Sequence, residues 1–294
     1  MNQKTLLPVF PVKSLYLAFG LFFSVGLLAV SGSTHAEMEA ELRQELSSKT
    51  DSDITVEGSF LMASRDSAHG RSYEIYRKSD KKLLFKGHFT ELLVDGDNII
   101  TGSKVSSTDD RAYITIGNLR SSVYYDIYNT DGIKLNSEPY FILPAEIGFG
   151  KDGLMPVLDK QGRHYYIDRH AKKTNFDLSS YKVIESFSNG LAVVRGKNEK
   201  AGYINTQGKL VIPLMYEQAY YFQGGTAMVS TSDGTYQLIT PDNQVVAMFT
   251  DTLVSYPGGK DSQEASYIFL RKKDGTAIAY NQKGEVISEK KSDE

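Results

Sequence analysis

Three polar residues on one expected strand could hold a metal ion. The segment "QGRHYYIDRH" places His164, Asp168 and His170 at even spacing, so their side chains would share one face of a β-strand. A strand rises about 3.3 Å per residue, which puts His164 and Asp168 roughly 13 Å apart, so only Asp168 and His170 could share an ion. A third ligand would have to come from elsewhere. We therefore interpret this face as an exposed polar strand and predict no metal site.

Paired carboxylates could hydrolyse a glycan if the fold brought them together. Asp168 and Glu217 are the candidates, and a separation of about 5 to 10 Å in a cleft would fit glycoside hydrolysis. The chain contains no cysteine, which excludes thiolate catalysis and cysteine-bound metals. It also has no nucleophile elbow, zinc-helix motif or phosphate loop. We therefore predict no catalytic residue, no cofactor and no enzyme; a glycan hydrolase or lyase is the alternative.

Aspartate-glycine pairs recur along the chain and resemble the start of calcium loops. None is followed by the alternating carboxylates and distal glutamate of such a loop, and hairpin turns account for all of them. The aspartate-glycine pairs begin at Asp95, Asp131, Asp152 and Asp274.

Tyrosine is unusually abundant, with 19 residues. Tyr73, Tyr125 and Tyr203 lie within a recurring strand phrase, where a half-buried ring is expected. Adjacent tyrosines have a different expected role from these, because neighbouring side chains of a strand point to opposite faces. One tyrosine of each adjacent pair could therefore be exposed and could stack on a sugar or dock a peptide. The adjacent pairs are Tyr124-Tyr125, Tyr165-Tyr166 and Tyr220-Tyr221.

Residues 1–36 have the pattern of an export signal. Lys4 and Lys13 supply a positive start, the stretch 14–30 is almost wholly apolar, and small residues near Ala36 suit cleavage after that position. The alternative is an uncleaved membrane anchor, since the apolar run approaches the roughly 20 residues that span a bilayer. We expect a periplasmic or secreted protein that meets the membrane only through this segment if it is uncleaved.

The next residues predict a short helix and a linker over 37–53. Met38, Leu42 and Leu46 recur at a spacing of four among strong helix formers.

The chain has 33 basic and 36 acidic side chains, a formal net charge of −3, and two of its lysines lie in the expected signal. Binding to nucleic acid needs a concentrated basic face, so we expect no nucleic-acid partner.

A β-repeat domain is predicted over 54–290, with a disordered tail at 291–294. Short runs of Val, Ile, Tyr, Phe and Thr end in Asn/Thr-rich turns, and these turns recur at steps of 35 to 41 residues. Each should close at a residue with positive φ, which suits Gly or Asn. The closing residues are Gly132, Ala171, Gly208, Asn243 and Gly284, with an earlier copy at Asp80.

A second phrase recurs before each hairpin. Phe149, Phe187 and Phe222 each begin a phrase of phenylalanine, glycine and apolar residues, and we expect each ring to face inward. Three strands follow in each unit. A unit of three strands cannot bury its apolar face alone, so neighbouring units must cover it.

The segment 187–222, "FSNGLAVVRGKNEKAGYINTQGKLVIPLMYEQAYYF", resembles a WG repeat. Ala201 stands where that family has its tryptophan, and the chain contains no tryptophan at all. The resemblance implies a bacterial, often exported, all-β protein, and it implies no specific chemistry. The residues that match the repeat are Gly190, Leu191, Ala192, Val194, Lys200, Gly202, Tyr203, Ile204, Gly208, Ile212, Pro213, Tyr216, Ala219 and Phe222.

These observations predict an all-β fold of tandem three-stranded hairpin repeats in a propeller-like or strongly curved array; an open β-solenoid is the alternative. For function we expect an exported, non-enzymatic binding or scaffold protein of the bacterial cell envelope, with a protein or an envelope polysaccharide as its partner. A membrane-anchored envelope protein is a further alternative.

Overall fold

The structure is a computed structural model that describes residues 40, 43–44, 53–67, 70–104, 114–116, 119–121, 123–250, 252–255 and 268–291. The predicted signal peptide lies outside these residues, as does the tail beyond residue 291. Within the predicted helix, the described residues Ala40, Arg43 and Gln44 are helical. Contacts divide the chain into two units, Met1–Leu42 and Arg43–Glu294. No helix among the described residues is long and apolar enough to cross a membrane.

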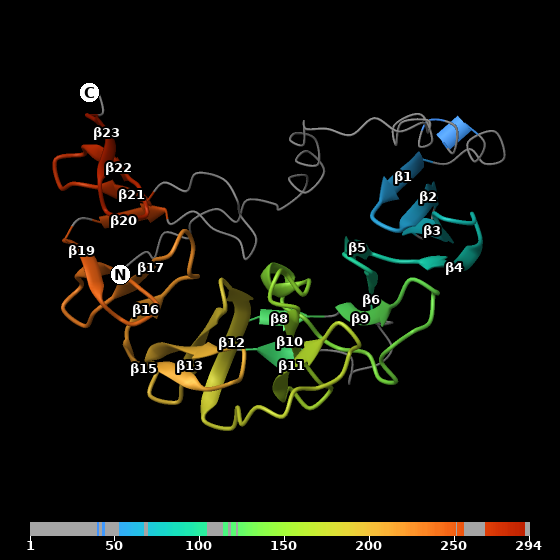
Figure 1. Cartoon of the computed structure of the whole chain (residues 1–294), viewed down its shortest axis with the longest axis horizontal. Helices are drawn as coiled ribbons and strands as arrows, with labels where there is room; N and C mark the ends of the chain where they lie inside the picture. The colour runs from blue at the N-terminus through green and yellow to red at the C-terminus, as the bar shows by residue number, and fades with distance from the viewer. Residues whose placement is uncertain are drawn as a thin grey trace, which may run out of the picture. The chain divides into compact units, whose positions relative to one another are not determined.

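The second unit consists mainly of β-strands, most of which pair antiparallel with their neighbours in sequence (Figure 1). Its first sheet contains β1 (Asp53–Glu57), β2 (Phe60–Ser67), β3 (Gly70–Arg77) and β4 (Leu83–His88). Its second contains β5 (Glu91–Asp95), β6 (Asn98–Lys104) and β9 (Val123–Tyr128), and a separate hairpin of β7 (Ile114–Ile116) and β8 (Leu119–Ser121) is inserted between the last two. The short 3₁₀ helix η1 (Pro144–Glu146) precedes β10 (Leu154–Leu158) and β11 (His164–Asp168), which form a two-stranded sheet.

Three four-stranded sheets complete the described chain. They are β12 (Tyr181–Ser188), β13 (Leu191–Gly196), β14 (Ala201–Asn205) and β15 (Leu210–Tyr216); then β16 (Gln218–Ala219), β17 (Ala227–Ser230), β18 (Tyr236–Ile239) and β19 (Val245–Phe249); then β20 (Thr252–Ser255), β21 (Ile268–Arg271), β22 (Ala277–Tyr280) and β23 (Val286–Lys290). Each is an antiparallel meander, the arrangement of a propeller blade.

The repeating sheet thus contains one strand more than predicted. The three expected strands of the best repeat are β13, β14 and β15, and β12 pairs with β13 in front of them. The prediction of three strands was therefore one strand short in these sheets, while the all-β class and the small antiparallel repeats are confirmed. Closure of the units into a ring stays a prediction.

The Asn/Thr-rich turns share one hydrogen-bond pattern. The side-chain oxygen of Asn205 accepts the backbone N–H groups of Gln207 and Lys209 at 3.1 and 3.0 Å. Because two amides of the turn bond to a single oxygen, the turn is fixed before the next strand begins. The equivalent oxygens of Asn129, Asp168 and Asn281 make the same two bonds.

The predicted closing residues all have positive φ, except in the first copy. There the residue with positive φ is Lys81, at 56°, so the assignment to Asp80 was wrong by one position. The side chain of Asp80 instead accepts the N–H of Lys82. The confirmed closing residues are Gly132 (74°), Ala171 (56°), Gly208 (77°), Asn243 (64°) and Gly284 (77°).

All three closing glycines have a second reason for lacking a side chain, and a Cβ on Gly132 would lie 2.7 Å from Cβ of Leu84 in β4. A Cβ on Gly208 would lie 2.4 Å from the ring of Phe176, and a Cβ on Gly284 would lie 2.4 Å from Cβ of Ala247. All three contacts belong to the chain before the sheet that carries the glycine. The turn of one unit therefore packs directly on the preceding unit.

The inward phenylalanines lie between successive units, as predicted. Phe187 and Phe222 are 2% and 1% exposed, and each ring packs against a tyrosine of the preceding unit. The ring centroids of Tyr166 and Phe187 are 4.8 Å apart, and those of Tyr203 and Phe222 are 4.9 Å apart. The core is therefore a series of apolar layers between sheets, which explains why one unit cannot bury its face alone.

The outer strands carry a recurring β-bulge. The register shifts by one residue in the pairings β3–β4, β18–β19 and β22–β23, and the pairing β14–β15 shifts at two places, one of them by one residue between Tyr203 and Ile204. Where the bulge inserts an extra residue, side chains no longer alternate between the buried and the exposed face of the strand. This explains why two adjacent aliphatic residues are exposed at the start of three outer strands. A bulged edge also resists pairing with another chain. These exposed pairs are Leu210-Val211, Val245-Val246 and Val286-Ile287.

Candidate functional site

A groove of about 210 Å³ lies beside η1, between the β10–β11 sheet and the first strand of the next sheet, β12. Most of its lining is aliphatic, and its charged or titratable residues are Glu146, His164 and Lys182. The volume is below the roughly 300 Å³ at which drug-sized pockets begin, so it suits one side chain or a group of similar size. The remaining lining residues are Leu143, Pro156, Val157, Leu158, Gly162, Val183 and Ile184.

Glu146 is the buried acidic residue of this groove. Its side chain is 6% exposed, and its two carboxylate oxygens accept different donors. The backbone N–H of Ser186 donates to Oε2 at 2.6 Å, and the hydroxyl of Tyr221 donates to Oε1 at 2.7 Å. These donors come from β12 and from the segment between β16 and β17. Glu146 therefore connects three successive units of the fold.

A β-bulge in β12 places the last residues of this strand next to the Glu146 carboxylate. The pairing of β12 with β13 shifts between Ile184 and Phe187, so Glu185 and Ser186 occupy the irregular step. Bulges re-aim side chains and are frequent next to functional sites. Here the bulge brings the Ser186 amide to Glu146 and places Glu185 close enough to interact electrostatically with it.

The two glutamates differ in electrostatics. Burial, followed by the nearby charge of Glu146, raises the pKa of Glu185 to about 7, although Arg195 partly opposes this. Glu146 accepts hydrogen bonds from a backbone N–H and from a phenol O–H, which hold its carboxylate in place. Burial, followed by the charges of Glu146 and Glu185, raises the pKa of the Tyr221 hydroxyl. The hydroxyl therefore stays protonated and donates a hydrogen bond to Glu146.

The two basic lining residues add little positive charge to the groove. The ammonium of Lys182 donates to Glu199 of the neighbouring turn, and the Lys182 side chain is 56% exposed. Burial lowers the pKa of His164, although hydrogen bonds to the backbone at Leu178 and Tyr181 partly offset it. The lowered pKa disfavours the charged imidazolium form of His164. The groove thus combines aliphatic walls with a carboxylate that is held in place by two hydrogen bonds.

The polar residues of the predicted strand have different roles in the structure. His164 lines the groove, whereas Asp168 accepts the N–H groups of His170 and Lys172, both at 2.9 Å, and so closes its turn. Among the described residues no group of three or more His, Asp or Glu side chains could hold a metal ion.

The other carboxylate candidate, Glu217, pairs with Lys200 and does not line the groove. The acidic pair that the fold brings together is Glu146 and Glu185, which the sequence analysis did not single out. The only sequence signal was their position, two or three residues before Phe149 and Phe187. Neither proximity nor burial could be read from that position, because Glu146 meets residues 40 and 75 positions away.

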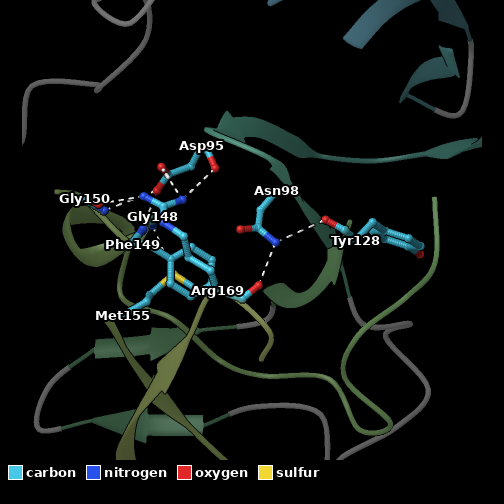
Figure 2. Close-up of polar contacts among 8 residues, drawn as sticks. All are labelled: Asp95, Asn98, Tyr128, Gly148, Phe149, Gly150, Met155 and Arg169. Carbon is cyan, nitrogen blue, oxygen red and sulfur yellow. Dashed lines mark hydrogen bonds and ion pairs between the residues drawn. The ribbon is translucent and has the colours of Figure 1, made fainter. Parts of the chain in front are cut away.

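The aspartate-glycine pairs form turns, as predicted, and Asp95 has a further role (Figure 2). Its carboxylate accepts the N–H of Phe149 and pairs with Arg169, whose guanidinium lies over the Phe149 ring at 5.3 Å. Arg169 Nη2 also donates to the carbonyl of Gly150 at 2.7 Å. This cluster joins β5 to the β10–β11 unit and is satisfied internally, so we assign it to the fold.

Two of the three adjacent tyrosine pairs divide between a buried and a half-buried position, whereas Tyr220 and Tyr221 are both half-buried, so the expectation of an exposed ring in each pair was wrong. Tyr125 and Tyr166 are buried, while their neighbours Tyr124 and Tyr165 are half-buried. The buried hydroxyl of Tyr166 donates to the carbonyl of Glu185 at 2.7 Å, and that of Tyr203 donates to the carbonyl of Tyr220 at 2.9 Å. These tyrosines therefore link neighbouring units.

Comparison with known proteins supports the repeat. The family model for the WG containing repeat matches residues 202–236, a window that runs from β14 into β18 and so spans the contact between two sheets. The resemblance seen in the sequence is thereby confirmed for this part of the chain. No curated protein matches the sequence.

Several solved structures resemble the chain at low identity. The crystal structure of BamB from Moraxella catarrhalis is 11% identical, with 80% of this chain and 71% of that chain covered and a TM-score of 0.37. Hsv2 from Kluyveromyces lactis is 14% identical, with 76% and 71% covered and a TM-score of 0.38. The C-terminal WD40 domain of Sif2 is 12% identical, with 82% and 73% covered and a TM-score of 0.37.

Proposed function

We propose that this chain is an exported, non-enzymatic binding scaffold of the bacterial cell envelope, and that it holds a protein partner at the groove beside Glu146. The observation that carries the proposal is the fixed carboxylate. Groups from β12 and from the segment before β17 hold Glu146 against the groove. A site that is already ordered loses little entropy on binding, which favours recognition.

A protein partner fits the groove better than a polysaccharide. The residues that line it include no aromatic ring on which a sugar face could pack. Its aliphatic walls suit the side chain of a protein instead. The N-terminal export pattern of residues 1–36 supports a location in the periplasm or outside the cell.

The test is capture of a partner by crosslinking to tagged protein in intact cells of the source bacterium, with three versions of the chain. Val183→Phe fills the groove, and Val245→Phe makes the same change on the exposed surface of β19. We expect one partner to be captured by the natural chain and by Val245→Phe but lost with Val183→Phe. Equal capture by both variants would contradict the groove as the binding site. Matching circular dichroism melting curves would show that both variants fold.

A glycan hydrolase is the second candidate, and Glu185 is the observation that favours it. A carboxyl group with a pKa of about 7 near a second carboxyl group is the acid and base arrangement of many glycosidases. Incubation with isolated envelope glycan and measurement of new reducing ends tests it. Activity that disappears in both Glu185→Gln and Glu146→Gln would support the hydrolase and contradict the non-enzymatic proposal.

A further inference from the structure

We infer that the groove beside Glu146 receives a lysine side chain of the partner protein; this inference rests on the proposed function. Shape gives the first argument. Lysine is a flexible stem of four methylene groups that ends in a compact charge. The groove offers aliphatic surface from Leu143, Leu158 and Ile184 along its walls and a buried carboxylate among its lining residues. Its volume of about 210 Å³ accommodates one long side chain.

Charge gives the second argument. The carboxylate of Glu146 is held in place by the Ser186 amide and the Tyr221 hydroxyl, and Glu185 lies close enough to interact electrostatically with it. The ammonium of Lys182 pairs with Glu199 at the surface, and burial lowers the pKa of the half-buried His164, which disfavours its charged form. A cation entering the groove therefore meets a net attraction, which is strengthened because water is partly excluded there.

Geometry distinguishes lysine from arginine. An arginine side chain gains most when its planar fork bonds both oxygens of a carboxylate in parallel. In Glu146 one oxygen accepts the Ser186 amide and the other the Tyr221 hydroxyl, so the two are already oriented by different donors. An ammonium group acts as a point charge and needs only one direction of approach. The site therefore selects an alkylammonium over a guanidinium.

The probe is N-acetyl-lysine N-methylamide, titrated into the isotope-labelled full-length chain while the backbone amides are followed by NMR. The norleucine analogue keeps the aliphatic stem without the charge, and the arginine analogue keeps the charge in another shape. We expect the lysine analogue to shift the amides of Val183, Ile184 and Ser186. Because an interaction with a charged group is lost, the norleucine analogue should bind roughly tenfold or more weakly.

Variants locate the effect. Glu146→Gln should weaken binding of the lysine analogue by roughly tenfold or more, whereas Glu138→Gln removes an exposed charge outside the groove and should not change it. If Glu146→Gln disturbs the fold, Val183→Phe tests the same site by filling it. The inference is overturned if norleucine binds as well as lysine, if the shifted amides lie elsewhere, or if Val183→Phe leaves binding unchanged.

The two proposals fail in different ways. Capture of a partner that depends on Val183, together with no binding of the lysine analogue, would overturn the lysine inference and leave the groove as a docking site. If partner capture does not depend on Val183 and the lysine analogue does not bind, both the inference and the proposed function are overturned.

Discussion

The guanidinium of Arg169 lies directly against Asp95, although the two residues are 74 positions apart. Its Nη1 donates to the Asp95 carbonyl oxygen at 2.9 Å and to Oδ1 at 3.1 Å. Because the same carboxylate also accepts the N–H of Phe149, one aspartate holds the end of β5 to the loop that begins the β10–β11 unit. The contact therefore joins two neighbouring units of the fold.

Replacing Asp95 with alanine should therefore destabilise the protein. The change removes the carboxylate that accepts the Phe149 amide and forms an ion pair with the partly buried Arg169, which costs about 1–3 kcal/mol in the free energy of unfolding. Urea denaturation followed by circular dichroism measures it. Glu138→Ala is the control, because its ion pair with Lys160 is exposed and should leave the midpoint unchanged. Equal midpoints for the two variants would contradict the role of Asp95.

The turn glycines allow backbone strain to be separated from close packing. Gly208 and Gly234 have φ of 77° and 84°, but only Gly208 faces a neighbour, since nothing lies within 4 Å of a Cβ on Gly234. Gly234→Ala should cost about 1–2 kcal/mol from its left-handed backbone alone. Gly208→Ala should cost about 1–3 kcal/mol more, because the Phe176 ring must move. The same denaturation experiment compares them, and equal costs would show that the turn does not pack on the preceding unit.

Glu185 makes stability depend on pH in a defined direction. Because burial and the charge of Glu146 raise its pKa from 4.5 to about 7, the folded state holds this proton more tightly than the unfolded state. The free energy of unfolding should therefore fall as the pH rises from about 4.5 to about 7 and then level off. Glu185→Gln should lose this component of the pH dependence.

The titration itself can be observed by NMR of the Glu185 carboxyl carbon. We expect a midpoint near pH 7 in the natural chain and a lower midpoint in Glu146→Gln, since the neighbouring charge is gone. A midpoint near 4.5 in the natural chain would contradict the burial of Glu185 beside Glu146.

Export predicts a processed N-terminus. Mass spectrometry of the protein recovered from the source bacterium should find a chain that starts at Glu37, because small residues precede the expected cleavage after Ala36. A chain that retains residues 1–36 and sediments with membranes would favour the anchored alternative.

Much of the fold could be predicted from local chemistry. The turn at Gly208 was readable because a left-handed closing residue and an Asn205 oxygen acceptor are properties of a few adjacent residues. The first strand of the repeat, β12, was harder to recognise. Its bulge at Glu185 and Ser186 interrupts the alternation of apolar and polar residues by which strands are identified.

The candidate site could not be predicted in the same way. His164 was noted as a potential ligand of a metal, yet its actual surroundings are carbonyls and an aliphatic groove. Glu146 had no motif at all. Its role depends on Ser186 and Tyr221, which three-dimensional packing of successive units brings to it, and a single sequence carries no record of such distant contacts.

The most direct test of the binding proposal is site-specific photocrosslinking in intact cells of the source bacterium. A photoreactive phenylalanine is placed at position 183 in the groove, or at position 245 on the exposed surface of β19 as the matched control. The account predicts one discrete protein adduct from position 183 and none from position 245. Adducts of equal yield at both positions, or no adduct at position 183, would contradict the groove as the place where this scaffold holds its partner.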